Sequence, residues 1–166
     1  MDEMEPLDAT FHDEAALTAA SDLAVVCNKE DDDLLHQLEA NLACEDGDVT
    51  LRTLVGWGTG EAEREQGVDL DDYLALWRTV VATGFPARAM EGELPEAGSD
   101  VYLVGSAGPL GLGWMASTTW DGLAADPGAA TMAAAILEFA AAREPAVADR
   151  VPALLPPSPA TGCSSK

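Results

Sequence analysis

Asp32, His36 and Glu39 form the grouping in this sequence whose residue types and spacing could do chemistry. A helix would place these three residues, spaced i, i+4 and i+7, on one side. A histidine among carboxylates can ligate a divalent cation or form half of an acid–base pair. However, the chain contains 30 acidic residues and only two histidines among its 166 residues, so chance alone gives a histidine such neighbours. We therefore predict a histidine on a solvated acidic face, with no resident metal or other cofactor.

The remaining reactive residue types form no catalytic motif. The cysteines are odd in number and widely spaced: Cys27, Cys44 and Cys163. They contain no C-x-x-C pair, so they fit neither a disulfide framework nor a structural zinc site. The glycine-rich stretches at 56–60 and 105–113 lack both the lysine of a P-loop and the G-x-G-x-x-G pattern, which favours turns. The sequence predicts a protein that is not an enzyme.

Acidic blocks are the strongest feature of the chain. The formal net charge is −22, and it is unevenly distributed. Residues 1–83 carry 21 acidic and four basic side chains, whereas residues 84–166 carry nine and four. The negative electrostatic potential around a protein with this net charge attracts cationic partners and repels nucleic acid and anionic lipid. We therefore predict that the acidic half docks on a basic protein surface, without direct contact to nucleic acid.

The candidate partner-binding residues combine these acidic blocks with one tryptophan. Trp57 is flanked by glycines in a polar stretch, and tryptophan is enriched among interface hot spots. The full set is Asp31, Asp32, Asp33, Glu45, Asp46, Asp48, Trp57, Glu61, Glu63, Glu65, Asp71 and Asp72.

Three functions are compatible with this composition. The first is a binding protein, either an inhibitor or a nucleic-acid mimic, that docks on a nuclease, a toxin or a DNA-binding protein. The second is a small acidic adaptor or structural protein of a salt-adapted or GC-rich organism or its phage, in which charge serves solubility alone. The third is a carboxylate- or metal-dependent enzyme that uses Asp32, His36 and Glu39. We favour the first.

Hydropathy sets the expected location. No run of about 18 apolar residues is present, so a membrane span is not expected. Residues 1–6 carry no basic residue followed by an apolar run, so no secretory signal is visible. We therefore expect a cytoplasmic protein.

Periodicity and punctuation predict an α+β fold, mostly helical with a small antiparallel sheet. Expected helices cover residues 8–27, 30–42, 69–83 and 127–143. Expected strands cover 49–55, 100–105 and 111–117, and residues 56–67 are expected to form a loop. Residues 10–155 would form one globular domain between a flexible acidic segment at 1–9 and a disordered tail at 156–166.

Two of these helices have clear boundary signals. Asp69 is a good N-cap for the helix at 69–83, Gly84 fits the C′ position, and Pro86 prevents continuation. The pair Asp126-Pro127 is a typical helix start. The alanine-rich helix that follows is apolar nearly all round, so it is either buried centrally or pairs with another chain. A homodimer through residues 128–142 is the corresponding prediction.

Overall fold

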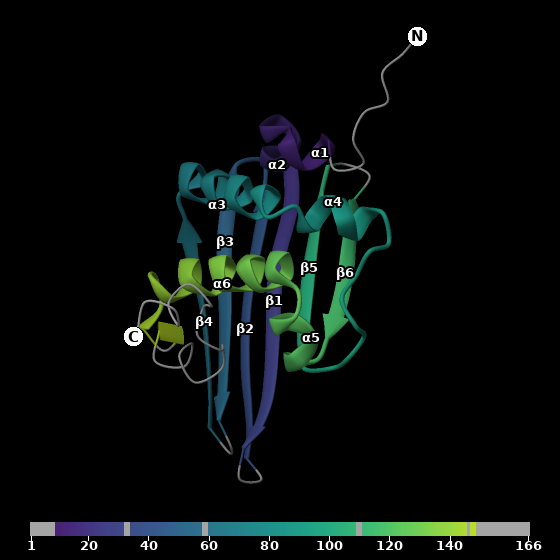
Figure 1. Cartoon of the computed structure of the whole chain (residues 1–166). Helices are drawn as coiled ribbons and strands as arrows, with labels where there is room; N and C mark the ends of the chain where they lie inside the picture. The colour runs from purple at the N-terminus through teal and green to yellow at the C-terminus, as the bar shows by residue number, and fades with distance from the viewer. Residues whose placement is uncertain (1–8, 32–33, 58–59, 109–110, 146, 149–166) are drawn as a thin grey trace, which may run out of the picture.

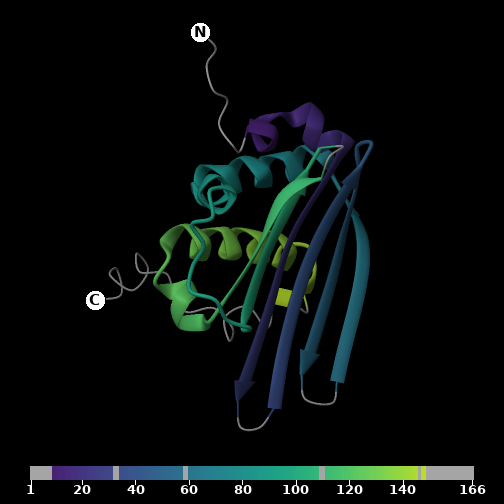
Figure 2. The same ribbon diagram turned by 90° about the vertical axis from the view of Figure 1, so that its right-hand side faces the viewer.

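The computed structural model describes residues 9–31, 34–57, 60–108, 111–145 and 147–148. Six antiparallel strands form one sheet in the order β4-β3-β2-β1-β5-β6 (Figure 1). The strands are β1 (Ala20–Asp31), β2 (Leu34–Glu45), β3 (Asp48–Trp57), β4 (Gly60–Val68), β5 (Val101–Ala107) and β6 (Leu112–Thr118). The helices are α1 (Ala9–His12), α2 (Glu14–Ala19), α3 (Leu70–Ala82), α4 (Phe85–Met90), α5 (Trp120–Ala124) and α6 (Pro127–Ala141). These helices lie on one face of the sheet and leave the other face open (Figure 2).

The fold is α+β, but the expectation of a mostly helical chain with a small sheet is wrong. The two helices expected at 8–27 and 30–42 are largely strands, because α1 and α2 end at Ala19 and are followed by β1 and β2. The decisive pattern is alternation. From Leu38 to Cys44, every second residue of β2 is buried, in the order Leu38, Ala40, Leu42 and Cys44, as a strand with one covered face requires.

The loop expected at 56–67 is also wrong, because Gly60–Val68 forms the edge strand β4. This strand contains Glu61, Glu63, Arg64 and Glu65 and no apolar run. Charged residues are common on edge strands, where they prevent pairing with other chains. The absence of apolar alternation therefore concealed the strand.

Residues 45–48, which follow the segment 30–42 that we expected to be helical, form a hairpin turn. The register pairs Glu45 with Asp48, so the connection between β2 and β3 consists of Asp46 and Gly47. Both have positive φ, 50° and 85°, which is the conformation of a type I′ turn. An Asp-Gly pair between two alternating segments is a strong hairpin signal.

Other expectations are confirmed. The expected strands at 49–55, 100–105 and 111–117 correspond to β3, β5 and β6, and the last two pair as a hairpin. The Asp69 side chain caps α3 by accepting from the backbone N–H groups of Asp71 and Asp72, at 3.1 and 3.4 Å. Gly84 adopts a left-handed conformation, with φ 78°. Pro86 lies in the first turn of a new helix, α4.

Helix α6 is buried centrally. Its inward residues have no exposed surface: Ala129, Met132, Ala133, Ile136, Leu137 and Ala140. They pack against α3 and against strands β1 and β2. A homodimer through residues 128–142 stays a prediction, and it would have to use outward residues of this helix such as Thr131 and Glu138.

An aromatic cluster joins the helices to β6. The rings of Phe11 and Trp77 stack with centroids 5.4 Å apart, and Trp114 of β6 meets Phe11 edge-on at 5.2 Å. The Trp114 ring lies over Gly105 of the neighbouring strand, where an added Cβ would stand 2.3 Å from a ring carbon. Gly105 therefore provides the space that Trp114 needs.

We expect Gly105→Ala to lower the free energy of unfolding by about 1–3 kcal/mol, because the tryptophan ring must move out of a packed cluster. Gly67→Ala is the matched control, since its Cβ would meet nothing closer than a carbonyl oxygen at 4.0 Å. Urea denaturation followed by circular dichroism measures both. Equal stability of the two variants would contradict the role assigned to Gly105.

A bidentate ion pair connects α4 to the start of α6. The Arg88 guanidinium donates to the two carboxylate oxygens of Asp126 at 3.0 and 2.7 Å. The same carboxylate caps α6 by accepting from the Ala129 N–H at 3.1 Å. The hydrogen bonds from Arg88 hold the pKa of Asp126 below its ordinary value, against the opposing effect of burial.

Asp126→Asn should therefore destabilise the protein by about 1–2 kcal/mol at pH 7, since asparagine keeps the cap but loses the charge pair. The pKa of Asp126 is lowered in the folded state, so its contribution is complete above the ordinary value of 3.8. It is lost as the pH falls through the lower folded value. The difference between wild type and variant should thus shrink as the pH falls below 3.8. Urea titrations at several pH values measure it, with Glu138→Gln on the same helix as control; a pH-independent difference would contradict the assignment.

Candidate functional site: the open face of the sheet

The face of the sheet opposite the helices, which we call the open face, is built by alternate residues of each strand. On β1, the side chains of Ser21, Leu23, Val25 and Cys27 are buried under the helices. The alternate residues Asp22, Ala24, Val26 and Asn28 are exposed or half-buried on the other side. Because the strands pair in continuous register, this alternation extends across the sheet.

Seven carboxylates gather on the open face, around a single arginine. We call this group the acidic patch: Asp22, Glu39, Glu45, Asp48, Glu61, Glu63, Glu65 and Arg52. Its net charge is −6. All its carboxylate residues are exposed except Glu39, which is half-buried.

The arrangement within the acidic patch brings like charges together. Glu61, Glu63 and Glu65 are alternate residues of β4, so successive carboxylates are about 6.7 Å apart along the strand. Glu45 is directly opposite Asp48 in the register. Like charges in directly opposite positions destabilise a sheet. Since the net charge of the acidic patch is −6, we expect it to lower the stability of the fold.

Acidic residues on the helix side differ, because several of them stabilise the fold. Asp13 caps α2 by accepting from the backbone N–H of Ala15 at 3.0 Å, and Asp69 caps α3. Glu14 forms an ion pair with Arg78, and Asp72 with Arg143 at 3.0 Å.

Within the described part of the chain, the acidic patch makes one ion pair, between Arg52 and Glu63 at 2.9 Å. Asp22 accepts a hydrogen bond from the Ser106 hydroxyl at 3.2 Å, and Glu39 accepts from the Gln37 and Asn41 amides at 3.3 and 3.2 Å. The other carboxylates of the patch, Glu45, Asp48, Glu61 and Glu65, are exposed to solvent.

An apolar strip lies beside the acidic patch. It consists of Ala24, Val26, Tyr102, Val104 and Met115, on the open face of β1, β5 and β6. Met115 is 70% exposed, the largest fraction among the exposed large hydrophobic residues of the described chain. An apolar area bordered by charge is characteristic of protein-binding surfaces. The open face therefore combines charge with apolar contact area.

The structure brings together five of the candidate partner-binding residues. Glu45, Asp48, Glu61, Glu63 and Glu65 all belong to the acidic patch. Asp46 lies in the hairpin turn at the end of that patch. Asp71 and Asp72 lie at the start of α3 on the helix side and do not join them.

The other candidates were not placed, and some patch members were missed. Only the backbone of Asp31 and Trp57 is described, and Asp32 and Asp33 lie outside the described residues. Sequence reasoning missed Asp22 and the whole apolar strip. The alternation of residues 20–28 and 101–107 is the signal that would have revealed them.

The helical grouping of Asp32, His36 and Glu39 does not exist. Residues 34–45 form β2, in which three residues span about 10 Å, so His36 and Glu39 are not neighbours on a helix face. Glu39 belongs to the acidic patch, and Asp32 lies outside the described residues. Among the residues that the structure describes, no three histidine, cysteine or acidic side chains are placed to hold a metal ion.

The two described cysteines are packing residues. Cys27 and Cys44 are both buried as free thiols. Burial raises the pKa of Cys27 to about 12 and also raises the pKa of Cys44. The Cys44 thiol also donates to the Thr18 carbonyl oxygen at 3.3 Å. Because the thiolate is the nucleophile, these side chains are unreactive at neutral pH.

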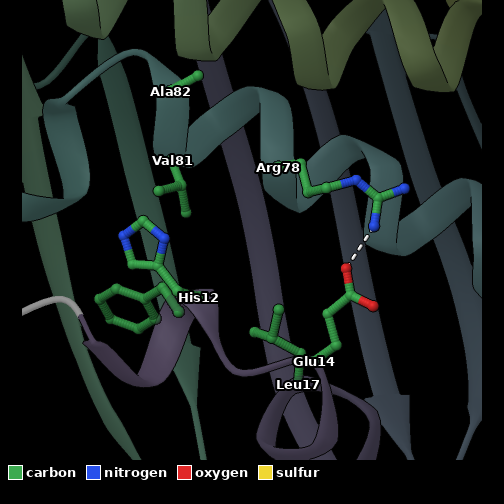
Figure 3. Close-up of a pocket in the computed structure, with 7 residues that line it drawn as sticks. His12, Glu14, Leu17, Arg78, Val81 and Ala82 are labelled. Carbon is green, nitrogen blue, oxygen red and sulfur yellow. Dashed lines mark hydrogen bonds and ion pairs between the residues drawn. The ribbon is translucent and has the colours of Figure 1, made fainter.

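A hollow of about 310 Å³ lies between the N-terminal helices and α3 (Figure 3). It is lined by Phe11, His12, Glu14, Leu17, Arg78, Val81 and Ala82. The His12 ring points toward Val81, and Arg78 reaches across the hollow to Glu14 (Figure 3). The lining offers the Arg78–Glu14 ion pair, the His12 ring and apolar carbon.

The chain matches no protein-family model and no curated protein sequence. No helix in the described ranges has the length and apolar character needed to cross a membrane.

Neutralising the acidic patch should stabilise the protein. We expect the triple variant Glu39→Gln, Glu61→Gln, Glu65→Gln to gain about 0.5–2 kcal/mol at low salt, because like-charge repulsion is relieved. The melting temperature of the wild type should rise between about 0.05 and 1 M NaCl, and that of the triple variant should rise less.

The matched control is Glu91→Gln, Glu96→Gln, Glu138→Gln, which removes the same charge from exposed positions outside the open face. Differential scanning calorimetry measures all three proteins. An equal gain in both variants would show that the charges of the acidic patch repel no more than those elsewhere.

Proposed function

We propose that this chain is a non-enzymatic acidic binding protein whose open face docks on a basic surface of a partner protein. The partner would be a nuclease, a toxin or a DNA-binding protein, and the bound chain would act as an inhibitor or nucleic-acid mimic. A cytoplasmic location is part of the same proposal. The observation that carries it is the concentration of seven carboxylates around a single arginine on one face of the sheet.

The spacing of the carboxylates on the open face supports a partner that binds the phosphates of nucleic acid. Successive carboxylates along β4 are about 6.7 Å apart. This distance is twice the rise of about 3.4 Å between successive phosphates on one DNA strand. A surface that holds phosphates with lysine and arginine can therefore meet ordered carboxylates instead. A partner that binds nucleic acid accounts for the sign of the charge, its concentration on one face and its regular spacing.

In this proposal the net negative charge accelerates association with the partner, and the apolar strip contributes the affinity. At physiological salt, a sphere of about 20 Å radius with 22 charges has a surface potential of about 1.3 kcal/mol per unit charge. A field of this size guides encounter and accelerates association more than it adds affinity. The apolar strip next to the acidic patch supplies the contact area that holds the complex together.

A capture experiment tests the proposal. Immobilised wild-type protein is incubated with an extract of its source cells at about 50 and 500 mM NaCl, and bound proteins are identified by mass spectrometry. We expect basic, nucleic-acid-binding proteins to be recovered at low salt and lost at high salt, as screening weakens the contact. The direct interaction is then measured by calorimetry with the purified partner.

Two variants separate specific docking from general attraction to a polyanion. Glu39→Gln, Glu61→Gln, Glu65→Gln should weaken binding of the purified partner at least tenfold. Asp71→Asn, Glu138→Gln, which removes exposed charge from α3 and α6 on the helix side, should leave it within about threefold. Equal losses would favour the alternative that the acidity serves solubility alone. Recovery of no basic protein at either salt concentration would also contradict the proposal.

A further inference from the structure

Strand β6 is a free edge of the sheet (Figure 2). The direction of its backbone groups follows from β5. The Asn28 N–H donates to the Asp100 carbonyl oxygen at 2.7 Å, and the Gly108 N–H donates to that of Ala20 at 2.8 Å. Even-numbered residues of β5 therefore bond to β1, and odd-numbered residues bond to β6.

The same alternation fixes which groups of β6 point outward. The odd-numbered residues of β5 pair with Leu112, Trp114, Ala116 and Thr118. The N–H and C=O groups of the intervening residues, Gly113, Met115 and Ser117, therefore point away from the sheet. In the described part of the chain, no backbone group bonds to them from the outer side.

The two edges of the sheet are built differently. Strand β4 carries four charged residues, which discourage pairing with another strand. Residues Leu112–Thr118 of β6 include no charged residue and no proline. Leu112 and Met115 on this edge are 43% and 70% exposed. The chain thus protects one edge and leaves the other open to strand addition.

Strand β6 is also held in place before any partner arrives. The Trp114 ring packs over Gly105, and β6 approaches β5 so closely that a Cβ at Gly113 would stand 2.0 Å from the Gly105 carbonyl oxygen. A template fixed in this way loses little conformational freedom on binding. Strand addition uses such an edge, with main-chain hydrogen bonds for affinity and alternate side chains for specificity.

We infer that the outer edge of β6 binds an extended, cationic segment of the partner protein as a seventh strand of the sheet. The inference rests on the proposed function for the charge of the partner. A second copy of this chain is disfavoured at the same edge because it would bring a charge of −22 against another of −22.

The two sides of the edge specify an alternating segment. On the open face, an added strand would lie beside Met115 and the apolar strip, which fit apolar side chains. On the helix side, the segment 91–100 runs beside β6 (Figure 2) and carries Glu91, Glu93 and Glu96. Basic side chains fit there. The expected ligand therefore alternates apolar and basic residues, with a period of two.

Hydrogen exchange of the full chain tests this inference. The probe is an eight-residue peptide of alternating lysine and valine, at about 50 mM NaCl. We expect exchange at the Gly113, Met115 and Ser117 amides to slow at least tenfold when the peptide binds. The same peptide with N-methyl groups on alternate residues, so that one edge cannot donate, should give no protection. A glutamate–valine peptide should also give none.

Two variants of the edge complete the test. Met115→Pro removes an outward N–H without removing a hydrogen bond to β5, a position that tolerates proline. It should abolish peptide binding, whereas Met115→Val should preserve it. The N-methylated peptide tests the same hydrogen bonds if the proline variant fails to fold.

The outcomes distinguish this inference from the proposed function. Protection confined to β2, β3 and β4, and lost in Glu39→Gln, Glu61→Gln, Glu65→Gln, would overturn strand addition while leaving the acidic docking surface intact. Equal protection by the N-methylated or the glutamate–valine peptide would overturn the inference. Protection that depends on protein concentration without peptide would assign the edge to a second copy and also overturn it.

Discussion

The structure depends on one constraint: all the described helices pack on the same face of an antiparallel sheet. Burial of one face requires apolar residues at every second position of each strand, and the helices must supply a continuous apolar layer above them. Helix α6 meets this requirement because its alanines allow close approach to β1 and β2. The cluster of Phe11, Trp77 and Trp114 closes the layer at one end. The opposite face of the sheet is thereby left free for a different use.

The same constraint explains what the sequence could predict. Elements with local punctuation were identified correctly, because a cap such as Asp69 or Asp126 acts within three residues. Strands β1, β2 and β4 were not, because their stability comes from neighbours distant in sequence. In β2, Leu, Ala and Glu are strong helix formers, and tertiary pairing overrides that preference. The acidic composition of the site was visible in the sequence, but its concentration on one face depended on a register that only the fold establishes.

Some acidic residues of this chain cap helices or pair with arginines, whereas the positions of others give the fold no evident benefit. In a chain that is acidic only for solubility, acidic residues would settle where they are least costly, at helix starts and next to arginines, as Asp13 and Glu14 do. The placement of Glu45 opposite Asp48 has no such benefit, and the three glutamates in alternate positions on β4 share one arginine, Arg52, which pairs with Glu63. Arrangements that reduce stability without a structural return are typical of functional surfaces, where stability and activity compete.

The difference between the two edge strands of the sheet is a second, independent observation that supports the proposed binding surface. Strand β4 shows that this chain can protect an edge with charge, and the same device at β6 would need only one or two substitutions at Met115 or Ser117, whose side chains face solvent or are half-buried. Instead β6 presents three outward backbone positions between apolar side chains. The unprotected edge adjoins the apolar strip, and the strip adjoins the acidic patch. Under the proposed function, a single extended partner segment would engage the backbone edge while the body of the same partner covers the carboxylates, and the open face and its edge would then act as one binding surface.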